Sequence, residues 1–104
     1  MGAKDSFAQL LIDAYAAGIK AATVDIKWDG RKHADPLTGA TPSGLTRESV
    51  LSEFMVQIEA SVAEYVATAP HAAPYDLEIS NTQDAVMDAW ENGYEAYEPW
   101  WPGE

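Results

Sequence analysis

The chain has 104 residues, of which 47% are hydrophobic, and it contains no cysteine. This length suits one small domain with a modest core. The lack of cysteine excludes a disulfide framework, a thiolate metal site and a cysteine nucleophile. No apolar run reaches the roughly 18 residues that cross a bilayer, and Asp5 and Asp13 interrupt the N-terminal apolar stretch. We therefore expect no signal peptide and no transmembrane segment, and a protein that is cytoplasmic or part of an assembled particle.

The formal net charge is −11, and the charges are distributed unevenly along the chain. All six lysine and arginine residues lie in the first 47 positions, whereas residues 48–104 carry twelve acids and no lysine or arginine. This pattern argues against direct binding to nucleic acid or to an anionic membrane, because both need basic residues. The partner that such a field attracts is a protein with a basic surface.

The first predicted helix begins at Ser6, which forms the pattern of a capping box with Gln9. At 100° per residue its apolar face comprises Phe7, Leu11, Ala14, Gly18 and Ala22. The second half of this face is small, so we expect another backbone to approach it closely. Because glycine is a weak helix former, the helix could also end near Gly18.

Two short segments, residues 24–28 (VDIKW) and 75–79 (YDLEI), alternate apolar and charged residues. They could pair as a minor two-stranded β-ribbon that leans on the helices. The long loop at residues 29–45 is rich in glycine, proline, serine and threonine. A loop of this length is usually functional, disordered or ordered only by a partner, and its basic cluster leads us to predict partner contacts from Arg31, Lys32 and His33.

The second predicted helix begins after Thr46, a favourable N-cap, and ends before Pro70. Its apolar stripe comprises Leu51, Phe54, Met55, Ile58, Val62, Tyr65 and Val66. The last helix is predicted to begin at residues 80–82 and to end near Glu98, before Pro99. The sequence therefore predicts a mainly α, single three-helix domain over residues 1–104, with an aromatic, proline-flanked tail at 99–104.

The last helix carries an acidic stripe, which comprises Asp84, Asp88, Glu91, Glu95 and Glu98. Val86, Trp90, Tyr94 and Tyr97 project to the opposite side. Each like-charge pair at this spacing destabilises a helix by roughly 0.2 to 0.5 kcal/mol. Two interpretations stay open: a solvated face above an aromatic core, or a surface that contacts a basic partner.

Trp100 and Trp101 lie between two prolines in the tail. Adjacent side chains of an extended segment point in opposite directions, so both are difficult to bury in one small core. The pair could dock on its own domain, or it could anchor the chain in a pocket of a partner, where tryptophan is often a hot spot.

No motif in the sequence predicts a reaction. Residues 39–46 have the glycine spacing of a phosphate-binding loop, but Leu45 replaces the lysine that binds the phosphates. His33 and His71 have no partner at metal-ligand spacing, and no serine lies in a nucleophile elbow. We therefore expect no enzymatic activity, no cofactor and no metal.

The leading hypothesis is a non-enzymatic interaction protein, a small acidic structural subunit of a larger assembly. A virus or phage particle is the analogy for such a component. We predict that it binds its partner through the acidic stripe, Trp100 and Trp101. Association of the chain with copies of itself is a further open alternative. The alternative is an inhibitor of anti-defence type that blocks a basic nucleic-acid-binding groove by DNA mimicry, and the third hypothesis is a small enzyme.

Overall fold

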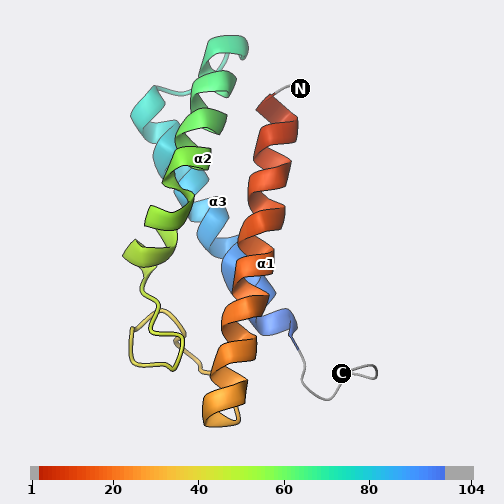
Figure 1. The fold of residues 1–104 in the computed structure, drawn as a ribbon. Helices are drawn as coiled ribbons and strands as arrows, with labels where there is room; N and C mark the ends of the chain where they lie inside the picture. The colour runs from red at the N-terminus through yellow and green to blue at the C-terminus, as the bar shows by residue number, and fades with distance from the viewer. Residues whose placement is uncertain (1–2, 98–104) are drawn as a thin grey trace.

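The computed structural model describes residues 3–97, which form three helices joined by a long loop and a short turn (Figure 1). The helices are α1 (Ala3–Asp29), α2 (Arg47–Thr68) and α3 (Tyr75–Ala96). The mainly helical prediction is confirmed. The predicted β-ribbon is wrong, because residues 24–28 belong to α1, residues 75–79 belong to α3, and residues 3–97 form no sheet. Within the same residues, no helix combines the length and apolarity needed to cross a membrane.

Helix α1 is longer than predicted at both ends. It begins at Ala3, so Ser6 lies inside the helix, and its hydroxyl donates to Glu64 Oε2 on α2 at 3.1 Å. It also continues through Gly18 and ends at Asp29. Gly30 then adopts a φ of 75° and donates its N–H to the carbonyl of Ile26 at 2.8 Å, which is a typical helix C-terminus.

Helices α1 and α3 cross in direct backbone contact. A Cβ atom added to Gly18 would overlap the carbonyl oxygen of Trp90, and one added to Gly93 would overlap the carbonyl oxygen of Tyr15. The two glycines therefore allow an approach that no other residue permits. This confirms the prediction that the small face of the first helix receives another backbone.

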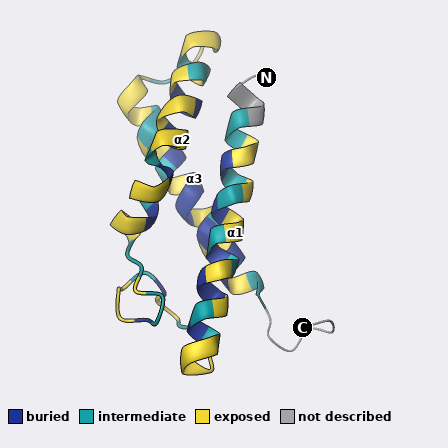
Figure 2. Ribbon diagram, viewed as in Figure 1, coloured by how far each residue is buried: buried dark blue, intermediate teal, exposed yellow. Residues whose placement is uncertain are grey.

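Helix α2 begins where the sequence predicts. The Thr46 side chain accepts a hydrogen bond from the N–H of Ser49, and the Ser49 hydroxyl accepts one from the N–H of Thr46. Phe54, Ile58 and Val62 of the predicted stripe are buried. Figure 2 shows buried residues along the facing sides of the helices and exposed residues along their outer sides. The buried hydrophobic residues are Leu10, Ala14, Ala21, Ala22, Val50, Phe54, Ile58, Val62, Val86, Met87, Trp90 and Tyr94.

Helix α3 begins at Tyr75, earlier than the predicted start at residues 80–82. Its N-cap is Pro74, which has no side-chain hydrogen bond to offer. The carboxylate of Glu78 instead accepts a hydrogen bond from the N–H of Ala73 at 3.0 Å. This contact orders the first turn, so residues 80–82 lie within the helix rather than at its cap.

Candidate interaction site

The acidic stripe is exposed wherever the structure describes it. Asp84, Asp88, Glu91 and Glu95 all lie on the solvent side of α3. The fifth member of the stripe, Glu98, lies outside the described residues, as do Trp100 and Trp101. The predicted tail contacts therefore stay predictions.

The opposite face of α3 forms the centre of the core. Val86, Trp90 and Tyr94 are buried, with exposed fractions of 2% or less. The rings of Trp90 and Tyr94 stack with centroids 5.6 Å apart and an interplanar angle of 14°. Tyr97 is partly buried and packs against the same cluster. These aromatic residues are core residues, so the acidic stripe is the face of α3 that is left for contacts.

Basic residues from the first half of the chain reach the two ends of the stripe. Arg47 Nη2 lies 3.1 Å from Asp84 Oδ1, in an ion pair that is exposed on both sides. Lys32 Nζ donates to the main-chain carbonyl of Glu95 at 2.7 Å. Because Glu95 lies in the last turn of α3, this contact satisfies a carbonyl without a helical partner and stabilises the negative end of the helix. An exposed ion pair such as the first contributes only about 0 to 1 kcal/mol.

Helix α2 is acidic as well, apart from the stripe on α3. Glu48, Glu53 and Glu59 are exposed on it. The helix contains four acids, one arginine and no lysine. Helices α2 and α3 are packed against each other. Each of the two helices therefore carries exposed acids, while Lys20 and Lys27 lie on α1.

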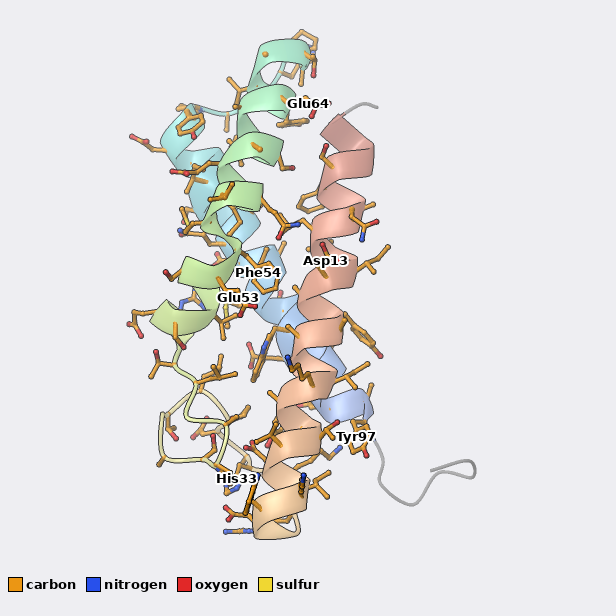
Figure 3. The ribbon with its side chains drawn as sticks, viewed as in Figure 1. Asp13, His33, Glu53, Phe54, Glu64 and Tyr97 are labelled. Atoms are coloured by element: carbon orange, nitrogen blue, oxygen red, sulfur yellow. The ribbon has the colours of Figure 1, made fainter. Side chains whose placement is uncertain are left out.

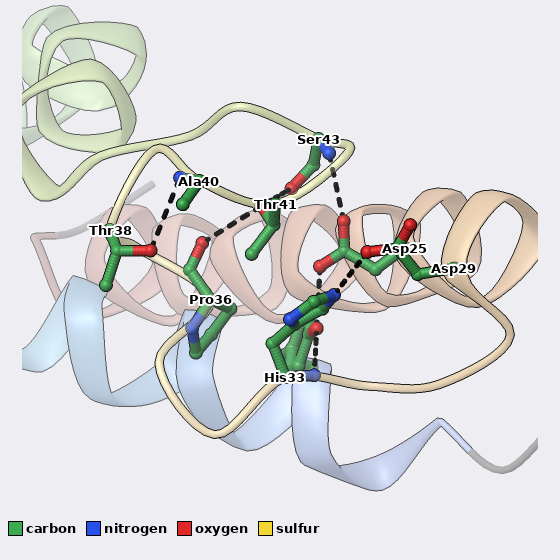
Figure 4. A network of polar contacts seen from close by, with 9 residues as sticks. Asp25, Asp29, His33, Pro36, Thr38, Ala40, Thr41 and Ser43 are labelled. Atoms are coloured by element: carbon green, nitrogen blue, oxygen red, sulfur yellow. Dashed lines mark hydrogen bonds and ion pairs between the residues drawn. The ribbon is translucent and has the colours of Figure 1, made fainter.

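The long loop, residues 30–46, is held against α1 and α3 by a buried polar network (Figure 4). The N–H of His33 donates to the Tyr94 hydroxyl at 2.9 Å, and this hydroxyl donates to Asp25 Oδ2 at 2.6 Å. The other oxygen of Asp25 accepts the N–H of Ser43 at 2.9 Å. The loop is therefore anchored at two points that are ten residues apart, and its first turns lie beside the C-terminal end of α3.

Asp25 is the chemical centre of this network. It is 0% exposed, and such a carboxylate is costly to bury unless hydrogen bonds compensate for its lost hydration. Both of its oxygens accept a hydrogen bond, and these two bonds compensate for the lost hydration. Burial, together with the hydrogen bond to Asp25, raises the pKa of Tyr94 to about 12. The phenol therefore stays a donor at any ordinary pH.

Sequence reasoning missed the role of Asp25, although the sequence contains an indication of it. Asp25 follows Ala14, Gly18 and Ala22 at helical spacing, and this face was predicted to be buried. Because residues 24–28 also alternate like a strand, the position of Asp25 on the buried face of the helix was missed. A lone acid on the buried face of a helix predicts a buried partner for that acid.

The structure brings two of the three predicted loop residues next to the stripe. A cleft of about 110 Å³ lies between loop and helix, and it is lined by Lys32, His33, Ala34, Pro36, Glu91, Tyr94 and Glu95. His33 Nε2 also lies 2.9 Å from Asp29 Oδ2 at the end of α1. Arg31 is exposed. This end of the site thus presents both signs of charge, whereas the middle of the stripe presents only carboxylates.

Comparison with protein-family models, with curated proteins and with solved structures finds no match to this chain. Its function must therefore be inferred from its own surface. Among the side chains that the structure describes, no three histidine, aspartate or glutamate residues are placed to hold a metal ion together.

Proposed function

We propose that this protein is a non-enzymatic interaction protein, a small acidic subunit of a larger assembly, that binds a basic surface of its partner. The observation that carries the proposal is the division of α3 into two faces. Its aromatic face is buried in the core, and its other face holds four exposed acids in one row. A partner that supplies lysine or arginine side chains would relieve the repulsion along this row.

The ends of the stripe support a defined orientation of the partner. Acids in the middle of the stripe attract any basic surface, and they accelerate association more than they fix its geometry. Lys32 and His33 line a cleft at one end of the stripe, whereas Arg47 forms an exposed ion pair with Asp84 at the other end. Because the two ends differ, a partner whose shape fits the cleft would bind in one register. The tail residues Trp100 and Trp101 stay a predicted apolar anchor for the same partner.

The test is affinity capture from native extract with matched charge reversals. In the first variant, Asp88, Glu91 and Glu95 are changed to lysine. In the control, Glu48, Glu53 and Glu59 on α2 are changed to lysine, so the net charge changes equally. We expect the control to retain a basic protein and the stripe variant to lose it, while both remain helical by circular dichroism. Equal capture by the two variants would contradict the proposal.

The alternative function, a DNA mimic, uses the same stripe and is separated by competition. Carboxylates three or four residues apart on a helix are separated by about 4.5 to 6 Å along its axis, which is comparable to the phosphate repeat of a nucleic-acid strand. The exposed row on α3 favours this candidate. Duplex DNA added during capture would displace a nucleic-acid-binding partner from the protein. Capture that duplex does not reduce favours the assembly subunit.

A further inference from the structure

The three helices leave one end of their core uncovered. We call this the open end: the first turns of α1, the last turns of α2 and the first turns of α3, which lie at the top of Figure 1. It contains a groove of about 460 Å³, which is within the size range of ligand pockets. The groove is lined by Phe7, Ser61, Val62, Tyr65, Glu78, Asn81 and Thr82.

The groove lies where the apolar face of α2 continues beyond the buried core and is no longer covered by the other helices. Tyr65 lies seven residues after Ile58, on the same face of α2, yet Ile58 is 0% exposed and Tyr65 is 44% exposed. Phe7, at the corresponding end of α1, is also only partly buried. Helices α1 and α3 are in backbone contact at Gly18 and Gly93, far along both helices from the groove. Figure 1 shows α3 crossing behind α1, so the starts of these two helices lie apart.

The described charges at the groove are acidic. Glu78 lines it, and Glu64, next to the lining residue Tyr65 in the chain, accepts the Ser6 hydroxyl across the space between α1 and α2. In Figure 3, Glu64 lies near the N-terminal end of α1. No lysine or arginine is among the described side chains that line the groove. A second copy of this chain would bring the same two acids to the contact, so charge complementarity selects a basic occupant instead.

We propose that the open end binds a basic amphipathic helix of a partner protein, with one apolar side chain of that helix inserted in the groove. Phe7, Val62 and Tyr65 would surround the inserted side chain, and Glu64 and Glu78 would face lysine or arginine residues beside it. This is the helix-in-groove mode of recognition. The surface is separate from the acidic stripe, and the proposal holds whether or not the stripe has a partner.

A designed peptide tests the groove directly. The probe is a fluorescent helix of about 18 residues, or five turns, with leucines on one face and lysines on the other. Asn81→Trp places an indole in the groove from an exposed position, and Ser52→Trp adds the same group on the solvent face of α2. We expect the first change to weaken binding by about tenfold and the second to leave it unchanged, because only the first blocks the anchor. Equal affinity for the two variants would overturn the proposal.

A second pair of variants separates this surface from the stripe. Glu64→Gln with Glu78→Gln removes two charges but keeps the acceptor oxygens that bind Ser6 and the N–H of Ala73. Asp88→Asn with Glu91→Gln removes two charges from the stripe. We expect the groove pair to lower peptide affinity by about fivefold and the stripe pair to have a smaller effect. A larger loss from the stripe pair would overturn the groove proposal and leave the proposed function in place.

Discussion

The two ends of the helical bundle differ in how completely their interior groups are covered. At the closed end, which comprises the last turns of α1, residues 30–46 and the second half of α3, Asp25 is fully buried and both of its oxygens accept hydrogen bonds. At the open end, Tyr65 continues the core face of α2 but remains 44% exposed. The interior groups of the closed end are therefore buried and hydrogen-bonded, while the open end leaves apolar surface in contact with solvent.

The largest effect is expected at the glycine crossing. Gly18→Ala should lower the free energy of unfolding by about 3 kcal/mol or more. The new Cβ would overlap backbone atoms of α3, and these cannot avoid it by a change of rotamer. Gly30→Ala is the matched control: nothing lies within 4 Å of its Cβ, and only its φ of +75° opposes the change. We expect the control to cost about 1 to 2 kcal/mol in urea denaturation. Equal costs would mean that the crossing is not close-packed.

The next effect compares two positions on one face of α2. Ile58→Ala removes a side chain with 0% exposure and should cost about 2 to 5 kcal/mol of unfolding free energy. Tyr65→Ala removes a larger side chain, but much of it already contacts water, so we expect a cost of about 1 kcal/mol. Chemical denaturation of the two variants measures the difference. A cost at Tyr65 as large as that at Ile58 would show that the open end is closed in solution.

The third effect concerns the pH dependence of the closed end. The pKa of Tyr94 is about 12 in the folded chain against an ordinary value of 10.0, so its contribution to stability is complete below pH 10 and is lost as the pH rises through 12. Between these values the unfolded chain ionises at this site before the folded chain does, which removes roughly 3 kcal/mol of stability. Tyr94→Phe has no phenol at this position to ionise. The difference in unfolding free energy between the two proteins should therefore change by this amount between pH 10 and 12 in favour of the variant.

A matched series of urea melts at these pH values provides the measurement. Every other titrating group is common to the two proteins, so their difference isolates Tyr94. A difference that stays constant with pH would show that burial and the contact with Asp25 do not raise the pKa of Tyr94 in the folded chain.

The parts of the fold that depend on local sequence were predictable. Thr46 marks the start of α2 because its cap involves only neighbouring residues. The division of α3 into an acidic and an aromatic face follows from helical spacing alone. The close approach to α1 was visible in the small residues Ala14, Gly18 and Ala22, although not the matching Gly93 on α3.

The parts that depend on distant contacts were not predictable. Residues 24–28 alternate like a strand, but they continue α1, and in this helix Asp25 accepts a hydrogen bond from Tyr94, which lies 69 positions later in the chain. The early start of α3 depends on a contact between Glu78 and the N–H of Ala73 that compensates for Pro74. The groove was not predicted, since Tyr65 has the pattern of a core residue and only the packing of three helices decides whether it is covered. The stripe was predicted, but Arg47 and Lys32 at its ends come from the other half of the chain.

The size of the protein in native extract tests the central claim that its acidic surface contacts a basic partner. Size exclusion of the purified chain and of the native extract, both at low salt, provides the comparison. We expect the purified chain to elute as a small species and the chain in extract to elute with a much larger one, which high salt dissociates because exposed charges are then screened. A chain that elutes as a monomer in extract at low salt would contradict the account.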